Sequence, residues 1–399
     1  MRTSPNVAGI ESSATLAVAA IARDLKAAGV DILDLSAGEP DFDTPVLVSE
    51  AGIQAIRAGK TRYTPVAGIP ELRSAIARDL SRAHGVDARP AEVVVSNGAK
   101  QSLFNACFVL FGPGDRVLVP APYWPSYPDI IRLARAEPVL VRGPEDRGFK
   151  IGPSELEAVR DASTRGLLLN SPCNPSGVVY TLDELEAIVA WAGAHDIAVV
   201  SDEIYSRICF TDPRAPGVLD VQPDLEPRNV VVSGASKSYA MTGWRIGYTY
   251  AGAELTAAMT SLQSHTTANA SSPAQYAAVA AFSDPAELDV QRMREAFHGR
   301  RDLVVARVAA LLPDAHYIHP EGAFYLFFRA DDWYGEELSG SVALCQRLIE
   351  EAGVALVPGV AFGDDRYVRL SFAAADSVLD AAITRIAETL ARIPAARAG

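Results

Sequence analysis

The chain of 399 residues has little positive charge and no long apolar run. Lysine and arginine number 36 against 49 aspartates and glutamates, which gives a formal net charge of −13. A nucleic-acid-binding protein normally presents a basic surface, so this balance argues against that class. No stretch of about 18 uncharged apolar residues occurs, so we expect no membrane span. The N-terminal residues lack a basic segment followed by an apolar run, and we therefore expect no signal peptide and a cytoplasmic location.

Cysteine is also scarce, and its spacing excludes two common kinds of site. None of the four cysteines forms a C-x-x-C pair, and no group of cysteines and histidines has zinc-ligand spacing. We therefore expect no metal site. The cysteines are predicted to be buried thiols in a reducing compartment; they are Cys107, Cys173, Cys209 and Cys345.

Hydrophobic residues, in contrast, make up 49% of the chain, and its length suggests two domains. From about residue 90 to 250, short apolar runs alternate with helix-like segments. Continuous rather than alternating apolar runs are typical of strands buried on both faces, as in a parallel sheet. Their alternation with helices predicts an α/β fold. The runs occupy residues 92–96, 116–120, 166–170, 197–201 and 229–233.

After about residue 285 the pattern changes to a long polar helix, two further apolar runs and a last helix. We expect residues 286–399 to form a smaller α+β domain. Residues 46–285 are expected to form a large domain around a mostly parallel central sheet. Residues 1–45 lack the alternation and are assigned to an N-terminal arm and part of the small domain.

Two helix starts have the spacing of a capping box, in which a hydroxyl and a carboxylate three residues later satisfy free backbone N–H groups. One pair is Thr181 with Glu184, and the other is Ser154 with Glu157. We expect helices to begin just after Thr181 and Ser154.

Several apolar runs end in polar residues, including Asn170, Asp202 and Ser233. In open α/β sheets, ligands bind beyond the carboxyl ends of the strands, so the sequence predicts a site there. The alternative is that the strands simply leave the sheet into polar loops. The shared chemistry of the endings favours a site.

Small residues and one arginine at these ends suit a phosphate group. Gly98 and Ala99 lie where the run 92–96 turns into a helix, whose N-terminus attracts anions. Arg245 adds a planar, bidentate donor. Together they predict a phosphate held between two strand ends.

Asp202 and Lys237 extend this site. A carboxylate at the end of the run 197–201 needs a partner, which is either a helix start or a cationic nitrogen of a cofactor ring. A free lysine has a pKa of about 10.4 and is a poor nucleophile. Desolvation and the nearby Arg245 would lower the pKa of Lys237 and favour Schiff-base chemistry.

Seven motifs occur along this chain in the same order as in one known enzyme family. The chain resembles the class I aminotransferases, pyridoxal 5′-phosphate (PLP) enzymes of fold type I, and within them the bacterial aspartate and prephenate aminotransferases. The match runs nearly from end to end. The motifs are LSAGEPDFDTP (35–45), RYTPVAGIPELR (62–73), APYWPSYP (121–128), NSPCNPSGVVY (170–180), SDEIY (201–205), SKSYAMTGWRIGY (236–248) and VRLSF (368–372).

The resemblance implies PLP as cofactor and assigns residues to it. Lys237 would attach the cofactor covalently and then move the substrate proton. Asp202 would pair with the protonated ring nitrogen, which makes the ring an electron sink. The remaining contacts implied for PLP are Tyr205 and Asn174 to the ring oxygen, Trp124 stacked on the ring, and Gly98, Ala99, Ser236 and Arg245 around the phosphate.

The resemblance also implies a homodimer and a substrate class. Tyr63, and with less support Asn269, would reach the site of the neighbouring subunit. Arg369 would bind the substrate α-carboxylate, together with Gly38, Asn174 and Trp124. Residues implied for the side-chain carboxylate of an acidic substrate are Lys100, Ser13 and Thr15. The alternative for Lys100 is a solvated helix residue, and for Arg369 a surface ion pair.

The predicted reaction moves the amino group between aspartate or glutamate and a 2-oxo acid, 2-oxoglutarate or oxaloacetate, by a ping-pong mechanism. Glu11 stands near Ser13 where close relatives often carry Lys-Pro, and this departure bears on prephenate as an acceptor. A prephenate, aromatic or broad-specificity aminotransferase therefore stays open, as does a PLP lyase, racemase or decarboxylase of the same fold. A regulator with a DNA-binding module is disfavoured because the N-terminal segment has no basic cluster.

Overall fold

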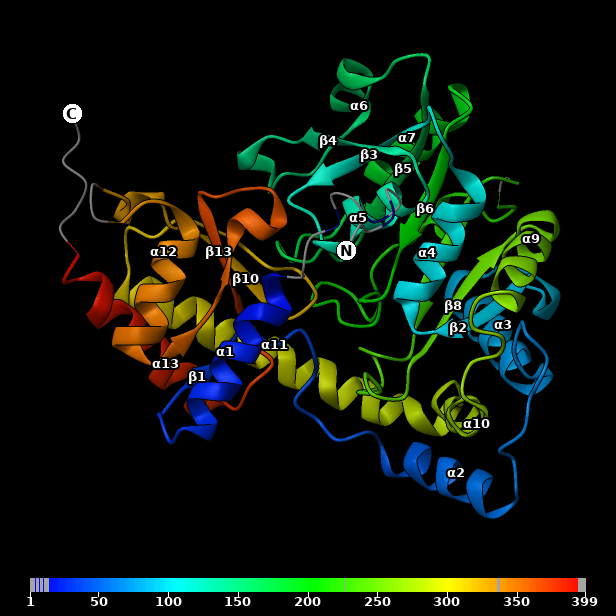
Figure 1. Ribbon diagram of the computed structural model, residues 1–399, viewed down its shortest axis with the longest axis horizontal. Coiled ribbons are helices and arrows are strands. Elements are labelled where there is room, and N and C mark those ends of the chain that lie inside the picture. Colours follow the sequence, from blue (N-terminus) through cyan, green and yellow to red (C-terminus); the bar gives the residue numbers. More distant parts are fainter. Residues whose placement is uncertain are drawn as a thin grey trace.

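A computed structural model describes residues 4, 7, 10, 14–225, 227–335 and 338–393. Its largest element is a seven-stranded sheet with the strand order β2-β8-β7-β6-β5-β3-β4 (Figure 1). Strand β8 is antiparallel to both of its neighbours, and the other strands run in one direction. The strands are β2 (Val93–Asn97), β3 (Arg116–Ala121), β4 (Glu137–Arg142), β5 (Thr164–Asn170), β6 (Ala198–Asp202), β7 (Val230–Gly234) and β8 (Ile246–Ala251).

This sheet lies between two layers of helices. Successive residues of a strand face opposite sides, and they enter two separate apolar clusters. Val199 packs in the cluster that includes α3, α7 and α10, whereas Val200 packs in the cluster that includes α4 and α5. The helices are α3 (Pro70–His84), α4 (Ala99–Leu110), α5 (Ser126–Leu133), α6 (Pro153–Val159), α7 (Leu182–Ala194), α8 (Val218–Val221), α9 (Ala253–Ser264) and α10 (Ser272–Ala281).

A second, smaller unit lies beside the first (Figure 1). It holds an antiparallel sheet of order β12-β13-β10-β9 and a parallel pair of β1 with β11. Its strands are β1 (Leu33–Asp34), β9 (Tyr317–Ile318), β10 (Tyr325–Arg329), β11 (Val354–Ala355), β12 (Val357–Pro358) and β13 (Tyr367–Ser371). Its helices are α1 (Ala14–Ala27), α12 (Gly340–Arg347) and α13 (Asp376–Leu390).

Two further helices complete the fold. Helix α11 (Glu287–Leu311) runs from the side of α10 toward α13, against which it packs (Figure 1). Helix α2 (Val46–Arg57) packs on α10 at the edge of the large unit. No helix within the described ranges is both long and apolar enough to cross a bilayer.

The predicted α/β fold is confirmed, and each predicted run of the central sheet is a strand. Two strands of this sheet, β4 and β8, were not predicted, because β4 has only three consecutive aliphatic residues, 139–141, and Gly247 and Thr249 interrupt the apolar residues of β8. The four cysteines are buried free thiols, as predicted.

Of the two predicted helix caps, one is confirmed. Thr181 Oγ1 accepts from Glu184 N, and Glu184 accepts from Thr181 N. The prediction for Ser154 with Glu157 is wrong. Helix α6 begins at Pro153, so Ser154 already lies inside the helix, and Glu155 accepts from Gly152 N at 2.7 Å instead. Proline has no N–H to satisfy and suits the first helical position, which moves the start two residues back.

Candidate functional site

A cavity of about 510 Å³ opens at the carboxyl ends of the central strands, where the sequence predicted a site. Strand β5 ends there at Asn170 and β6 ends at Asp202. The small unit closes the opposite side with Tyr325 and Arg369. Of the predicted residues, the cavity wall includes Gly38, Ala99, Lys100, Trp124, Asn174, Asp202, Tyr205, Ser236, Lys237, Arg245 and Arg369.

Lys237 lies in the short segment between β7 and β8, and its Nζ donates to the carbonyl oxygen of Gly38. Burial lowers the pKa of Lys237 to about 8. The positive charges of Arg369 and Arg245 act in the same direction, and the carboxylate of Glu39 opposes them. A useful fraction of this amine is therefore neutral near neutral pH, as a nucleophile or base requires.

Asp202 is buried beneath the same cavity. Its Oδ2 accepts from Tyr127 Oη at 2.7 Å, and its Oδ1 accepts from Ile204 N at 3.1 Å. Burial raises the pKa of Asp202 to about 6, although both hydrogen bonds and the positive charge of Lys237 lower it. A cationic group placed beside this carboxylate would offset the cost of its burial.

Tyr205 contacts the small unit through its hydroxyl. Its Oη lies 2.8 Å from Tyr325 Oη, and its ring lies 6.0 Å from Lys237 Nζ. Burial raises the pKa of Tyr205 well above its usual value, so the hydroxyl stays protonated and remains a hydrogen-bond donor.

Arg369 is 1% exposed and yet forms no ion pair with any described residue. Its Nη1 donates to Asn174 Oδ1 at 3.0 Å and its Nη2 donates to Ser36 O at 2.8 Å. Its Nε has no hydrogen-bond partner among the described residues. Because a buried cation without a counter-charge is costly, this group is suited to an anion that enters the cavity.

The guanidinium of Arg369 is also bordered by aromatic rings. It lies 4.3 Å from the ring centre of Tyr325 and 5.0 Å from that of Phe362. Cation–π contacts of this kind stabilise the charge without using its N–H groups. Because Arg369 is buried and pairs with no described carboxylate, the predicted alternative of a surface ion pair is wrong.

Gly98 and Arg245 form a second place for an anion. Gly98 has φ of +85°, and a Cβ there would come within 2.3 Å of Arg245 Nη2. Arg245 donates to Thr242 O at 2.9 Å and pairs with no carboxylate among the described residues. The close approach requires glycine and leaves the start of α4, at Ala99, beside a free cation.

Trp124 and Lys100 lie together on the cavity wall. Lys100 Nζ is 4.8 Å from the centre of the Trp124 ring, which itself packs edge-on against Tyr127. Burial, and secondarily the charge of Arg245, lowers the pKa of Lys100. No carboxylate of the described residues pairs with Lys100.

Three predicted residues that the structure describes are not part of this wall: Gly98, Tyr63 and Asn269. Tyr63 is 93% exposed, and Asn269 donates to the neighbouring Ala270 carbonyl. Ser13 lies outside the described residues, and so does the side chain of Thr15, although Thr15 belongs to α1. Within the described ranges, no cluster of His, Cys, Asp and Glu has the makings of a metal site.

Sequence reasoning assigned no role to three residues that hold this site together. Tyr127 fixes Asp202, Tyr325 contacts both Tyr205 and Arg369, and Asn170 donates to Asp202 O at 2.9 Å. Tyr127 stands only three residues after Trp124, and Asn170 is one of the polar strand ends. For Tyr325 no signal exists in the sequence, because it sits in a wholly apolar run.

The sequence and the structure were compared with known proteins. A family described as aminotransferase class I and II matches residues 30–386. An aspartate aminotransferase of Geobacillus stearothermophilus is 42% identical over 393 residues, which is 97% of this chain and 98% of the relative. An aspartate/prephenate aminotransferase of Cereibacter sphaeroides is 43% identical over 393 residues, which is 96% of this chain and 97% of the relative.

Solved structures give a similar result. An aspartate aminotransferase of Thermus thermophilus with maleate superimposes with a TM-score of 0.92 at 40% identity, and covers 98% of this chain and 100% of its own. The aspartate aminotransferase of Rhizobium meliloti superimposes with a TM-score of 0.93 at 37% identity, and covers 99% of this chain and 100% of its own.

Proposed function

The chain belongs to the class I and II aminotransferases, and we propose that it moves the amino group between an acidic amino acid and a 2-oxo acid. The protein is a PLP-dependent enzyme. The proposed pairs are aspartate or glutamate with 2-oxoglutarate or oxaloacetate. The observation that carries this proposal is Arg369, a buried cation at the wall of the cavity that pairs with no carboxylate in the described part of the chain.

The residues present fit PLP. The phosphate suits the cradle of Gly98 and Arg245, into which no larger side chain at position 98 would fit. The ring nitrogen, protonated, suits the buried carboxylate of Asp202. We propose that Trp124 stacks on the ring and that Ser236 joins Ala99 at the phosphate. When bound, PLP supplies an electron sink for the charge left on the substrate Cα.

The remaining steps belong to side chains of this protein. Lys237, with a pKa of about 8, is proposed to hold the cofactor covalently and then to take the α-proton and return it. Tyr205, whose hydroxyl stays protonated, and Asn174 are proposed to hydrogen-bond the ring oxygen. Arg369 and the Gly38 backbone are proposed to fix the α-carboxylate, so that the Cα–H bond points at Lys237.

Preference for an acidic donor is proposed to come from Lys100. Its ammonium group lies over Trp124 at the cavity wall and has no carboxylate partner among the described residues. A substrate side-chain carboxylate would fill that role. We propose that Ser13 and Thr15 assist it from the N-terminal arm. Prephenate is the alternative acceptor, because relatives such as that of Cereibacter sphaeroides carry it in their names.

We further propose a homodimer with shared sites. Helix α2 exposes Val46 (77%) and Ile56 (59%), an apolar surface of the kind found at protein interfaces. Tyr63, 93% exposed, follows this helix and is available to enter the site of a second copy, with Asn269 as a weaker candidate.

The domain division proposed from the sequence is kept: an arm of residues 1–45, a large domain of residues 46–285 and a small domain of residues 286–399. The pairing of β1 with β11 supports assigning the arm to the small domain. A cytoplasmic location is proposed from the four free thiols.

The test is a panel of donor amino acids assayed with 2-oxoglutarate and oxaloacetate, with prephenate as a further acceptor. We expect aspartate and glutamate to be the best donors and each turnover to yield a second 2-oxo acid. A PLP lyase or decarboxylase would consume the donor without forming that product. Such a result, or a clear preference for aromatic donors, would contradict the proposal.

A further inference from the structure

One face of the small antiparallel sheet carries a row of side chains that leads from solvent to the cavity. Across β10 and β13, Arg329 lies opposite Tyr367 and Phe327 lies opposite Arg369. Side chains two residues apart on a strand point to the same face, so Tyr367 and Arg369 share one face. The rings of Phe327 and Tyr367 stack at 4.7 Å. Arg369 is therefore packed in a row that continues through the buried ring of Tyr367 to the partly exposed Arg329.

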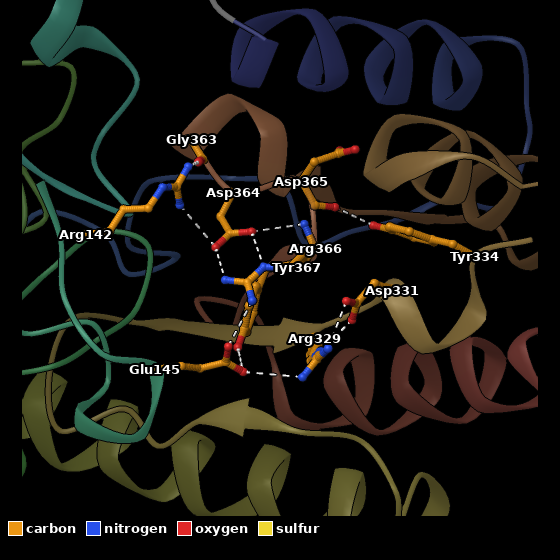
Figure 2. Close-up of polar contacts among 10 residues, drawn as sticks. All are labelled: Arg142, Glu145, Arg329, Asp331, Tyr334, Gly363, Asp364, Asp365, Arg366 and Tyr367. Carbon is orange, nitrogen blue, oxygen red and sulfur yellow. Dashed lines mark hydrogen bonds and ion pairs between the residues drawn. The ribbon is translucent and has the colours of Figure 1, made fainter. Parts of the chain in front are cut away.

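That outer end is held by the edge of the large sheet. Glu145, which follows β4, accepts from Tyr367 Oη at 2.5 Å and from Arg366 Nη1 at 3.0 Å. Arg329 Nη1 lies 3.7 Å from the same carboxylate. Figure 2 shows Glu145 reaching toward all three side chains of the small sheet. One carboxylate thus joins the two units at the start of β13.

A second anchor holds the loop that precedes β13. Arg142, at the end of β4, donates from Nη2 to Gly363 O at 2.7 Å (Figure 2). Its Nη1 lies 3.5 Å from Asp364 Oδ2. Gly363 directly follows Phe362, whose ring borders the Arg369 guanidinium. Both the strand and the ring that surround Arg369 are therefore tied to the end of β4.

Arg369 depends on such anchors because its own contacts are few. Its guanidinium is held by one side-chain amide and one carbonyl, those of Asn174 and Ser36, and by aromatic rings. A small shift of β13 would move it without breaking an ion pair. A bidentate grip on a carboxylate tolerates little misplacement.

We propose that Glu145 is a positioning residue, whose contacts with Tyr367 and Arg366 hold β13 so that Arg369 is pre-organised for the substrate α-carboxylate. The inference rests on the proposed function for the identity of that ligand. Loss of these contacts weakens carboxylate binding more than it slows proton transfer at Lys237, because Lys237 is carried by the segment between β7 and β8 of the large sheet and not by β13.

The test uses Glu145→Gln and Tyr367→Phe, alone and combined, in the PLP-loaded enzyme. Tyr367→Phe removes one hydroxyl and keeps the stacked ring. We expect each single variant to raise both the KM for aspartate and the Kd for maleate, an unreactive dicarboxylate, about tenfold, because part of the binding energy must then order Arg369. We expect kcat to stay within about twofold, a pattern of lost ground-state binding. The double variant should be much less affected than the product of the singles, because both remove the same contact.

The matched control is Glu155→Gln, which removes an ion pair with Arg147 at 2.7 Å in the same region, within the large unit alone. It should leave the maleate Kd unchanged. An unchanged Kd in Glu145→Gln and Tyr367→Phe, an equal change in Glu155→Gln, or a fall in kcat at constant KM would each overturn the inference.

The proposed substrate and the proposed role of Glu145 are tested by different measurements, so either can be wrong while the other holds. The donor panel with the wild-type enzyme decides the proposed substrate. The ratio of variant to wild type decides the role of Glu145, and it is measured with whichever donor the wild type uses, since every amino acid carries an α-carboxylate.

Discussion

The cofactor end of the cavity, around Asp202 and Lys237, and the carboxylate end, around Arg369, differ in how their residues are brought together. At the cofactor end, Asn170 and Asp202 lie directly opposite each other on neighbouring parallel strands. At the carboxylate end, Arg369 bonds to Ser36, 333 positions away, and to Asn174, 195 positions away. The Asn170–Asp202 pair at the first end is fixed by the register of one sheet. The second depends on how two units pack, and is therefore the more easily displaced.

The largest effect is expected at the cofactor end. Lys237→Ala removes the amine that is proposed to take and return the α-proton. It should lower kcat by about 10⁴-fold, the upper range for a general acid–base group. PLP should still bind noncovalently, because Asp202 and the Gly98–Arg245 cradle remain. Absorbance titration with PLP and a steady-state assay check both parts. Substantial residual transamination would contradict the assigned role.

The carboxylate end is tested by Arg369→Gln. Losing a buried, charge-assisted grip on the substrate should lower kcat/KM by about 10²-fold, at roughly 1.5–3 kcal/mol for each such bond. PLP affinity should change far less than substrate affinity, since Asp202, Lys237 and the Gly98–Arg245 cradle all remain. Arg301→Gln is the control, because Arg301 is also buried and lies over an aromatic ring, Phe210, but outside the cavity wall. A matching loss in Arg301→Gln would mean that the effect is one of stability.

Lys100→Ala sharpens the comparison between the two carboxylates of an acidic donor. We expect the KM for aspartate to rise about tenfold and that for phenylalanine by much less, because only aspartate carries the second carboxylate. Lys150→Ala is the matched control, since Lys150 also lies near an aromatic ring, Tyr180, away from the cavity. Equal losses for both donors would remove Lys100 as a specificity residue.

The smallest effect is a pH dependence at Lys237. Burial lowers the pKa of Lys237 to about 8, so its neutral form increases as the pH rises through that value. The rate at which the apoenzyme attaches PLP covalently, trapped with borohydride, should rise about fivefold from pH 7 to 8 and level off above it. Nα-acetyl-lysine, which keeps a free ε-amine, serves as the reference, with a pKa near 10.4. A protein profile parallel to that reference would contradict the lowered pKa.

The stability of the folded apoenzyme should also increase with pH in this range. Because the folded apoenzyme releases the Lys237 proton near pH 8 and the unfolded chain near pH 10.4, stability from this group is present above the latter value and is lost as the pH falls through 8. The Tm difference between wild type and Lys237→Met should follow that direction.

Local sequence determined most of the large sheet and its ligand end. The continuous apolar runs, their polar endings and the glycine at position 98 follow from burial on both faces and from backbone geometry, which neighbouring residues dictate. The Thr181 cap is equally local. Where local reasoning failed, as with Ser154, a proline one residue earlier changed the helix start.

Only the tertiary structure decided which side chains from distant segments meet. The sequence placed Arg369 on a strand without revealing which face it occupied, and it gave no sign that Tyr325 would contact Tyr205 or that Glu145 would contact Tyr367. These contacts arise where the two units pack together. Their energies depend on distances between segments that share no local hydrogen-bond pattern, so neither composition nor periodicity along the chain specifies them.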